Sequence, residues 1–355
     1  MRPTTTRRLV IDLASPRAVW RIGETSVAAI RAALASNWDV VEVQAPAASD
    51  GDGGSGSPES IAATRGAEIY LGYGVPAGVV EAGRPTLRWV HTGTAGVGST
   101  LPQLRGTGIV LTNSAGIHAE PIADWVIAAI AYFARGLDRM VAAQALGRWA
   151  KDEFTDLTVP VRELRALRVG IVGLGGIGSA VAQRAMALGM SVAGVRRRAH
   201  LGHVGHVGSK GGPAGLRWVG ILDELPRLAA ESDCLVIAAP HTGATAGAVG
   251  RRVLELLPKD AIVVNVSRGS LLDEAALLEL LDAGRLRGAA LDVFGMEPLP
   301  DDHPFWGHPR VLVSPHVSAV TDRFWERETA LIVDNIGRYL AGAPLTNVVD
   351  LEAGY

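Results

Sequence analysis

The chain has 355 residues, 48% of them hydrophobic, and its 34 basic and 36 acidic side chains leave a formal net charge of −2 at pH 7. At about 150 residues per domain, this is the composition of a globular protein with two domains, and it lacks the basic surplus of a nucleic-acid-binding protein. The single cysteine, Cys234, excludes an internal disulfide framework and a cysteine-rich zinc site, and is typical of a reducing compartment.

The N-terminus and the apolar runs bear on localisation. Asp12 interrupts the first apolar stretch, so no signal peptide is predicted. The longest apolar run, residues 125–134, is far shorter than the roughly 20 residues that a membrane span needs, and we interpret it as a buried helix. We therefore expect a cytoplasmic protein with neither membrane nor nucleic-acid partners.

The first 118 residues predict a small α/β domain. One helical stretch covers residues 26–35, and the polar, glycine-rich run at 50–58 is predicted to be a flexible surface loop. The strand-like apolar runs are residues 9–13, 40–43, 87–90 and 108–112. Short strands that alternate with helices favour a layered α/β structure.

A long apolar helix is predicted to follow. Apolar residues recur at helical spacing from Glu120 to about Gln144, with Pro121 near the first turn and Gly147 after the last. We interpret residues 119–147 as one helix that serves as a domain crossover or as a subunit interface.

The region from residue 168 to residue 314 has a more regular pattern. Six apolar runs alternate with helical stretches such as 177–188 and 273–283, which predicts a parallel sheet covered by helices on both faces. The six runs are residues 168–172, 191–195, 234–238, 261–265, 289–293 and 311–314. A last helix, at about 323–341, is expected to return to the first domain.

Residues 200–215 interrupt this pattern. They contain His200, His203 and His206 at a spacing of three, but glycine and valine separate the histidines and no carboxylate accompanies them. A loop is therefore favoured over a metal site, and no metal is predicted elsewhere in the chain.

The first strand of the regular region runs directly into a glycine-rich turn, Gly173-Leu-Gly-Gly-Ile-Gly178, which opens a helix. Gly173 permits the tight turn, Gly175 lets a pyrophosphate approach the backbone, and Gly178 allows the helix to pack closely. The helix N-terminus supplies unpaired N–H groups and a partial positive charge. This order of elements predicts dinucleotide binding, and the alternative is an ordinary glycine-rich strand-to-helix turn.

The end of the second strand bears on the choice of cofactor. An acidic residue there would accept a hydrogen bond from the ribose 2′-hydroxyl, but this strand ends in Arg196-Arg-Arg198. Guanidinium groups suit a 2′-phosphate, so NADPH is favoured over NADH. The alternative is that the three arginines form a solvated surface.

Polar residues follow three further strands: Arg268 after Val-Asn-Val-Ser, Glu297 after Leu-Asp-Val-Phe-Gly-Met, and His316 after Ser-Pro. Because the carboxyl ends of parallel strands meet at one edge, these side chains can converge on one cleft. Hydride transfer between nicotinamide and a carbonyl carbon needs such a cation and proton donor. Singly, Arg268 could cap a loop, Glu297 could be a solvated acid and His316 a structural histidine; their joint occurrence favours catalysis.

With these motifs the chain resembles the D-isomer-specific 2-hydroxyacid dehydrogenase family over most of residues 87–349. The matching stretches are residues 107–125, 164–192, 233–245, 261–300, 314–317 and 342–349. The resemblance implies an α/β protein of two domains. Residues 119–318 would form a Rossmann-type, doubly wound dinucleotide-binding domain, and residues 1–118 with 319–355 a smaller, flavodoxin-like substrate-binding domain.

The resemblance also implies catalytic roles. His316 would give its proton to the substrate carbonyl oxygen in reduction and take it back in the reverse direction, and Glu297 would pair with His316 and favour its protonated form. Arg268 would hold the substrate carboxylate and polarise its carbonyl, and Asp292 would contact the nicotinamide carboxamide. Glu297 argues against formate oxidation, because formate dehydrogenases of this fold pair the histidine with glutamine.

Further binding residues are implied in the same way. The cofactor would be bound by Gly173, Gly175, Gly176, Ile177, Gly178, Arg196, Arg197, Pro240, Thr245, Val266, Ser267 and Asp292. The substrate would be bound by Ala95, Gly96, Val97, Asn113 and Arg268. Ala95 and Gly96 would act through backbone N–H groups, and the nearby Gly98 stands where many members have aspartate. His91 and His118 are each open between a place at the substrate and a structural role.

The main hypothesis is a reductase that converts a small 2-keto acid to the D-2-hydroxy acid with NAD(P)H, with glyoxylate or hydroxypyruvate favoured. The alternatives are an NADH-linked reductase of bulkier aliphatic or aromatic 2-keto acids and a redox-sensing, NAD(H)-binding protein that resembles the C-terminal binding corepressors. A hydrolase lacks any nucleophile motif here. The apolar helix with Trp125, followed by Trp149, resembles the family's dimerisation region, so a homodimer is expected.

Overall fold

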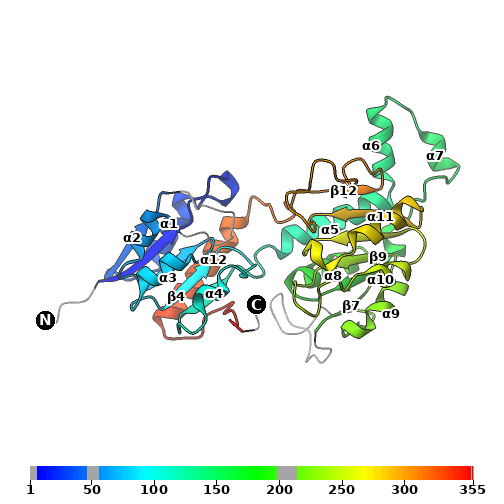
Figure 1. The fold of residues 1–355 in the computed structure, drawn as a ribbon. Coiled ribbons are helices and arrows are strands. Elements are labelled where there is room, and N and C mark those ends of the chain that lie inside the picture. The colour runs from blue at the N-terminus through cyan, green and yellow to red at the C-terminus, as the bar shows by residue number, and fades with distance from the viewer. Residues whose placement is uncertain (1–5, 46–55, 198–213, 353, 355) are drawn as a thin grey trace. The chain divides into compact units, whose positions relative to one another are not determined.

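The computed structural model describes residues 6–45, 56–197, 214–352 and 354 (Figure 1). The chain divides into two compact units, Met1–His118 with Val320–Tyr355, and Ala119–Ala319. Arg198, the three histidines of the 200–215 segment and residues 50–55 of the predicted surface loop lie outside the described residues.

The first unit is built on a five-stranded parallel sheet with the order β2-β1-β3-β4-β5, which is the flavodoxin-like order. Its strands are β1 (Arg7–Asp12), β2 (Trp38–Glu42), β3 (Ile69–Gly72), β4 (Trp89–Thr92) and β5 (Val110–Asn113). Its helices are α1 (Glu24–Ala32), α2 (Pro58–Thr64), α3 (Ala77–Gly83), α4 (Leu101–Leu104) and α12 (Phe324–Leu340). β3 was not predicted, because four residues that include a glycine carry too little pattern.

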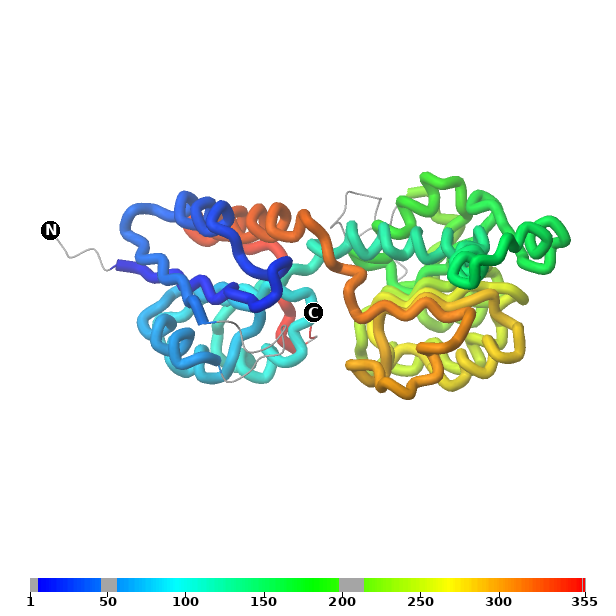
Figure 2. The backbone as a smooth tube through the Cα atoms, turned by 90° about the horizontal axis from the view of Figure 1, so that it is seen from above, coloured from blue at the N-terminus to red at the C-terminus, as the bar shows by residue number. Residues whose placement is uncertain are grey.

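Alternation along the central strand explains how the two faces of this sheet are covered. Leu9 and Ile11 of β1 belong to one buried cluster, which α1 and α12 complete, and Val10 belongs to the other, which α3 completes. α12 lies beside α1 although nearly the whole chain separates them (Figure 2). A hydrogen bond of 2.8 Å from Thr329 Oγ1 to Ser26 Oγ joins the two helices.

The second unit is built on a seven-stranded parallel sheet with the order β12-β11-β10-β9-β6-β7-β8. Its strands are β6 (Arg168–Val172), β7 (Ser191–Val195), β8 (Val219–Gly220), β9 (Cys234–Ile237), β10 (Ala261–Asn265), β11 (Leu286–Leu291) and β12 (Val311–Val313). The predicted α/β class with parallel sheets is confirmed, but the count of six strands was wrong because the two-residue β8 is too short to produce a pattern.

Helices cover both faces of the seven-stranded sheet. α5 (Ala119–Ala134) and α8 (Gly176–Ala187) pack on the face that carries Val169 and Ile171. The other face carries Val172, and helices α9 (Leu225–Ala230), α10 (Arg251–Glu255) and α11 (Glu274–Asp282) pack on it. Strands buried on both faces explain why the apolar runs in this region are continuous rather than alternating.

The single helix predicted over residues 119–147 was wrong. The structure has two helices there, α5 and α6 (Leu137–Ala145), followed by the short α7 (Lys151–Thr155). Gly136 separates α5 from α6 with φ of +70°, and a Cβ at this position would lie 2.8 Å from the Phe154 ring. A left-handed residue ends an α-helix, and the apolar spacing that continues across it conceals the break.

Within the described ranges, no helix is both long enough and apolar enough to cross a bilayer.

Candidate active site

The glycine-rich turn between β6 and α8 has the geometry that a pyrophosphate needs. Gly173 has φ of +99°, and a Cβ there would lie 2.6 Å from the backbone of Ala239. A Cβ at Gly178 would lie 1.9 Å from the carbonyl oxygen of Gly173, so α8 can approach the turn only with glycine at this position. In contrast, a Cβ at Gly175 would meet no described atom within 4 Å. Gly175 therefore faces open space at the N-terminus of α8, and these residues fit a dinucleotide phosphate.

The end of β7 presents cations in place of the acid that would bind a ribose hydroxyl. Arg196 directly follows β7 and is half-buried, and its backbone N–H donates to the carbonyl of Gly220 at 3.0 Å. Arg197 is exposed beside it. Further residues that the sequence predicts to bind the cofactor lie at the same carboxyl edge: Thr245 Oγ1 donates to the carbonyl oxygen of Pro240 at 2.6 Å after β9, and Val266 and Ser267 are buried directly after β10.

Arg268 is an exposed cation at the end of β10. The side chain of Asn265 fixes the turn, because its Nδ2 donates to the Arg268 carbonyl at 3.1 Å and its Oδ1 accepts from the Ser267 N–H at 3.1 Å. The Arg268 guanidinium donates only to the carbonyl of Ser267, at 2.6 Å, and no described carboxylate pairs with it. Its charge is thus available to an anionic substrate.

Glu297 and His316 form a hydrogen-bonded pair. Glu297 Oε1 accepts from the backbone N–H of Phe294 at 2.9 Å, and Oε2 lies 2.7 Å from His316 Nδ1. The two side chains are 35% and 47% exposed. Because Nδ1 is engaged and no described residue contacts Nε2, the imidazole presents Nε2 to a ligand.

Asp292 holds the loop that carries His316. This carboxylate is 1% exposed, and it accepts from the N–H groups of Val317 at 2.8 Å and Ser318 at 3.1 Å. It also accepts from the hydroxyls of Ser314, at 2.5 Å, and Ser318. These bonds hold a loop in which His316 has φ of +56°, a left-handed conformation that is uncommon for a non-glycine residue. The contact between Asp292 and nicotinamide stays a prediction, and the role of the carboxylate in this loop was missed from the sequence.

In the five-stranded unit, the loop after β4 carries the predicted substrate residues. Ala95 and Gly96 are exposed, and their backbone N–H groups have no acceptor within the described ranges. Asn113 is buried and its Nδ2 donates to the Ala95 carbonyl at 2.9 Å, while Val97 anchors the loop in the core. Asn113 therefore orders the loop, and adjacent unpaired N–H groups of this kind can bind an anion.

Of the two histidines of this unit, one is held at both ring nitrogens and the other packs on an aromatic ring. His91 is fully buried, with Nδ1 at 2.8 Å from Thr112 Oγ1 and Nε2 at 2.8 Å from Glu328 Oε1, so neither nitrogen is left for a ligand. His118 stacks on Phe324 with ring centroids 5.5 Å apart, and burial lowers the pKa of its imidazole. Glu328 was missed from the sequence, although it lies on the buried face of α12 between Phe324 and Ile332.

Comparisons with known proteins agree with this geometry. Residues 127–318 match the D-isomer specific 2-hydroxyacid dehydrogenase family, NAD binding domain. Glyoxylate/hydroxypyruvate reductase B of Pectobacterium carotovorum is 33% identical over 268 residues, which are 75% of this chain and 80% of that protein. D-3-phosphoglycerate dehydrogenase of Methanocaldococcus jannaschii is 30% identical over 244 residues; these cover 69% of this chain but only 44% of the relative.

A solved structure is similar over nearly the whole chain. It is the D-isomer specific 2-hydroxyacid dehydrogenase of Xanthobacter autotrophicus Py2 in complex with NADPH and MES, with a TM-score of 0.75 and 30% identity. The match covers 99% of this chain and 100% of the other.

Proposed function

Because the chain belongs to the D-isomer specific 2-hydroxyacid dehydrogenase family, it is an NAD(P)-dependent oxidoreductase, and we propose that it reduces a small 2-keto acid, with glyoxylate and hydroxypyruvate preferred. The product is the D-2-hydroxy acid. The observation that carries this proposal is the triple at the carboxyl edge of the seven-stranded sheet. There, an arginine has no carboxylate partner among the described residues, and an imidazole has its Nδ1 bound to a glutamate and its Nε2 without a described partner.

Each residue of the triple has one task in this reaction. The reduced nicotinamide supplies the hydride to the carbonyl carbon. Arg268 binds the substrate carboxylate and polarises the carbonyl, because a planar guanidinium donates two parallel hydrogen bonds. His316 gives the Nε2 proton to the carbonyl oxygen, and Glu297 accepts a hydrogen bond from Nδ1–H and so keeps Nε2 directed outward.

The substrate is proposed to be small and to carry no phosphate. In the five-stranded unit, the backbone N–H groups of Ala95 and Gly96, in the loop that Asn113 orders, are proposed donors to the substrate carboxylate. The relatives named glyoxylate/hydroxypyruvate reductase support the short keto acids.

NADPH is the proposed reductant. Arg196 and Arg197 stand at the end of β7, where an acid would repel a 2′-phosphate. The similar Xanthobacter structure that contains NADPH supports the same preference.

The test is a steady-state assay with NADPH and with NADH against glyoxylate, hydroxypyruvate, pyruvate, 2-ketoisovalerate and phenylpyruvate. We expect the highest kcat/KM with NADPH and one of the first two acids. Replacement of both Arg196 and Arg197 by serine should raise the KM for NADPH about tenfold or more and leave that for NADH unchanged. A preference for NADH in the unaltered enzyme contradicts the cofactor proposal, and turnover of phenylpyruvate alone contradicts the substrate proposal.

We also propose a homodimer formed through α6 and α7, which project from the seven-stranded sheet (Figure 1). The side chains of Leu146, Trp149 and Leu157 are 76%, 90% and 78% exposed. Apolar side chains gathered on a projecting segment are typical of a subunit interface. Light scattering after size-exclusion chromatography should give the mass of a dimer, and Leu146→Glu should give the monomer.

A further inference from the structure

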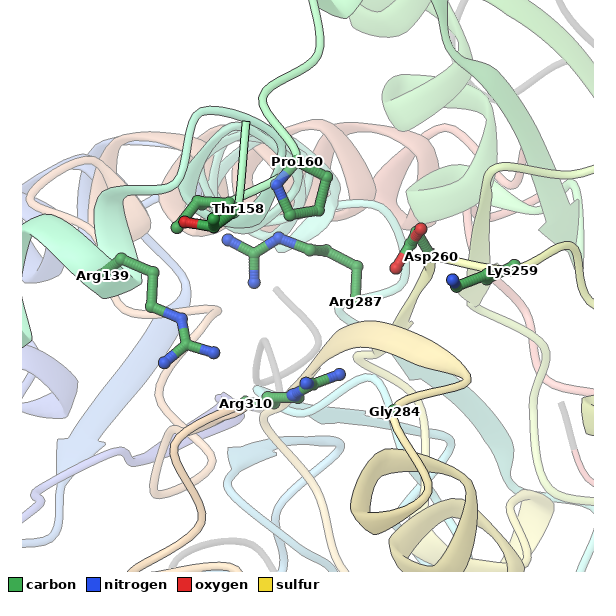
Figure 3. Close-up of a pocket in the computed structure, with 9 residues that line it drawn as sticks. Arg139, Thr158, Pro160, Lys259, Asp260, Gly284, Arg287 and Arg310 are labelled. Carbon is green, nitrogen blue, oxygen red and sulfur yellow. The ribbon is translucent and has the colours of Figure 1, made fainter. Parts of the chain in front are cut away.

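A charged cavity lies at the edge of the seven-stranded sheet opposite to the candidate active site (Figure 3). Its volume is about 220 Å³, and its walls come from α6, the segment that follows α7 and the residues that precede or begin β10, β11 and β12. Arg268, Glu297 and His316 follow the carboxyl ends of β10, β11 and β12. Five residues of strand at ~3.3 Å each separate the two edges by roughly 15 Å, so the cavity is distinct from the candidate active site.

Positive charge dominates this cavity. Arg139, Lys259, Arg287 and Arg310 line it, against the single lining carboxylate of Asp260. One further carboxylate belongs to the cluster: Asp138 pairs with Arg287 through two bonds of 2.9 and 2.5 Å and lies 3.8 Å from Arg139. Four cations and two carboxylates leave an excess of two positive charges around one small hollow.

The cations of the cavity keep unused donors. Neither Lys259 nor Arg310 forms an ion pair with a described residue, and the guanidinium of Arg310 donates one hydrogen bond within the described ranges, of 3.0 Å, to the carbonyl of Leu286. Arg287 is 6% exposed, and its Nε is buried without an acceptor in the part of the chain that the structure describes. A buried donor without a partner is costly unless a ligand or water satisfies it. In Figure 3 the guanidinium groups of Arg139, Arg287 and Arg310 surround the same space.

We propose that this cavity binds a small dianion of the phosphate type. The charge excess matches a doubly charged anion, and guanidinium forks match the oxygens of a tetrahedral phosphate. The volume is below the roughly 300–1,000 Å³ of sites for cofactor-sized ligands, so the anion is inorganic phosphate or the terminal phosphate of a small ester.

An anion bound in this cavity would contact residues that are far apart in the sequence of the unit. Arg139 belongs to α6, whereas Lys259 and Arg310 belong to the turns that enter β10 and β12. An anion that all three hold in the folded state alone stabilises that state by RT ln(1 + L/Kd), where L is the free anion concentration. The measurable consequence is a Tm that rises with phosphate beyond the effect of ionic strength.

The experiment titrates the full-length protein with inorganic phosphate by calorimetry and follows Tm, with sodium chloride at matched ionic strength. A double variant, Lys259→Gln with Arg310→Gln, removes two cations that are not buried. Arg252→Gln is the matched control, because Arg252 is an exposed cation of the same unit outside the cavity. We expect saturable binding in the unaltered protein, a Kd higher by about tenfold or more in the double variant, and no change in the control.

Three further readouts decide the proposal. Unchanged kcat and KM in the double variant support a site separate from catalysis. Glycerol 3-phosphate in place of phosphate distinguishes the sources, because tighter binding of the ester assigns the site to a phosphorylated small molecule. The same phosphate Kd in the double variant as in the unaltered protein, or no saturable binding beyond that of sodium chloride, overturns the proposal.

Discussion

Among the described residues, each unit of the molecule contains one histidine–glutamate pair, and the two pairs have nearly the same length. His91 Nε2 lies 2.8 Å from Glu328 Oε1 in the five-stranded unit, and His316 Nδ1 lies 2.7 Å from Glu297 Oε2 in the seven-stranded unit. The first pair has no exposed side-chain surface, whereas the side chains of the second are 47% and 35% exposed.

The two imidazoles differ in how many of their ring nitrogens already have a hydrogen-bond partner in the protein. Both nitrogens of His91 are engaged, by Thr112 and Glu328, so this ring can only hold β4, β5 and α12 together. His316 uses Nδ1 alone and leaves Nε2 open. A short His–Glu distance therefore does not by itself indicate a catalytic pair, because proton transfer to a ligand also needs an accessible ring nitrogen that no protein group occupies, and of these two imidazoles His316 has it.

Replacement of His316 should have the largest effect on chemistry. Without the Nε2 proton donor, His316→Ala should lower kcat by about 10²- to 10⁴-fold, because positioned general acids contribute that much. The affinity for NADPH, measured by fluorescence titration, should stay within about twofold of the original, since the pyrophosphate turn is untouched. Normal kcat in this variant removes His316 from the mechanism.

The two glutamates should separate activity from stability. Glu328→Ala leaves His91 Nε2 and Ser114 Oγ buried with a lost acceptor, and should lower the free energy of unfolding by about 1–3 kcal/mol. Glu297→Ala lies at an accessible pair, and should change stability by less than about 0.5 kcal/mol while it lowers kcat about tenfold or more. Urea unfolding and steady-state kinetics on both variants test this prediction. A larger loss of stability in Glu297→Ala, together with a larger loss of kcat in Glu328→Ala, would contradict it.

A substitution at Asp292 tests how far the exposed His316–Glu297 pair depends on the loop that carries His316. Asp292→Asn replaces one acceptor oxygen by a donor facing the N–H groups of Val317 and Ser318, so the His316 loop should loosen. We expect kcat to fall about tenfold with an unchanged KM for NADPH, because the loss acts through His316. A raised KM with normal kcat would instead favour direct contact with the nicotinamide. Ser318→Ala, which removes one hydroxyl donor to the same carboxylate, should show a smaller loss of the same kind.

The smallest effect concerns pH and His118. Burial, aided by the charge of Arg327 and opposed by that of Glu328, lowers the pKa of His118 below its ordinary value of 6.5. As pH falls, the unfolded chain takes up this proton before the folded chain does, so acid destabilises the fold. His118→Phe should make the fall in unfolding free energy between about pH 7.5 and 5.5 shallower, by at most about 1.4 kcal/mol per pH unit. An identical slope in urea-unfolding experiments contradicts this role of His118.

Much of the fold and the site could be read from local pattern. The five-residue β6, the glycines at 173 and 178 and the helix after them are set by short-range rules, because the turn requires Gly173 and the close approach of the helix requires Gly178. The same holds for the positions of Arg268, Glu297 and His316, which follow strand ends that apolar runs mark. The prediction of one helix at 119–147 failed where a single left-handed residue, Gly136, outweighed continuous apolar spacing.

By itself, the sequence determined six of the seven strands of the larger sheet, the phosphate-binding turn and the identity of the three polar residues at the carboxyl edge, because those features depend on neighbours within a few residues. Only the tertiary structure decided which His–Glu pair is buried, that Asp292 fixes the loop of His316, and that Arg287 meets Asp138 beside Arg310. Those contacts join residues far apart in the chain, and their energies depend on burial, which no local pattern encodes.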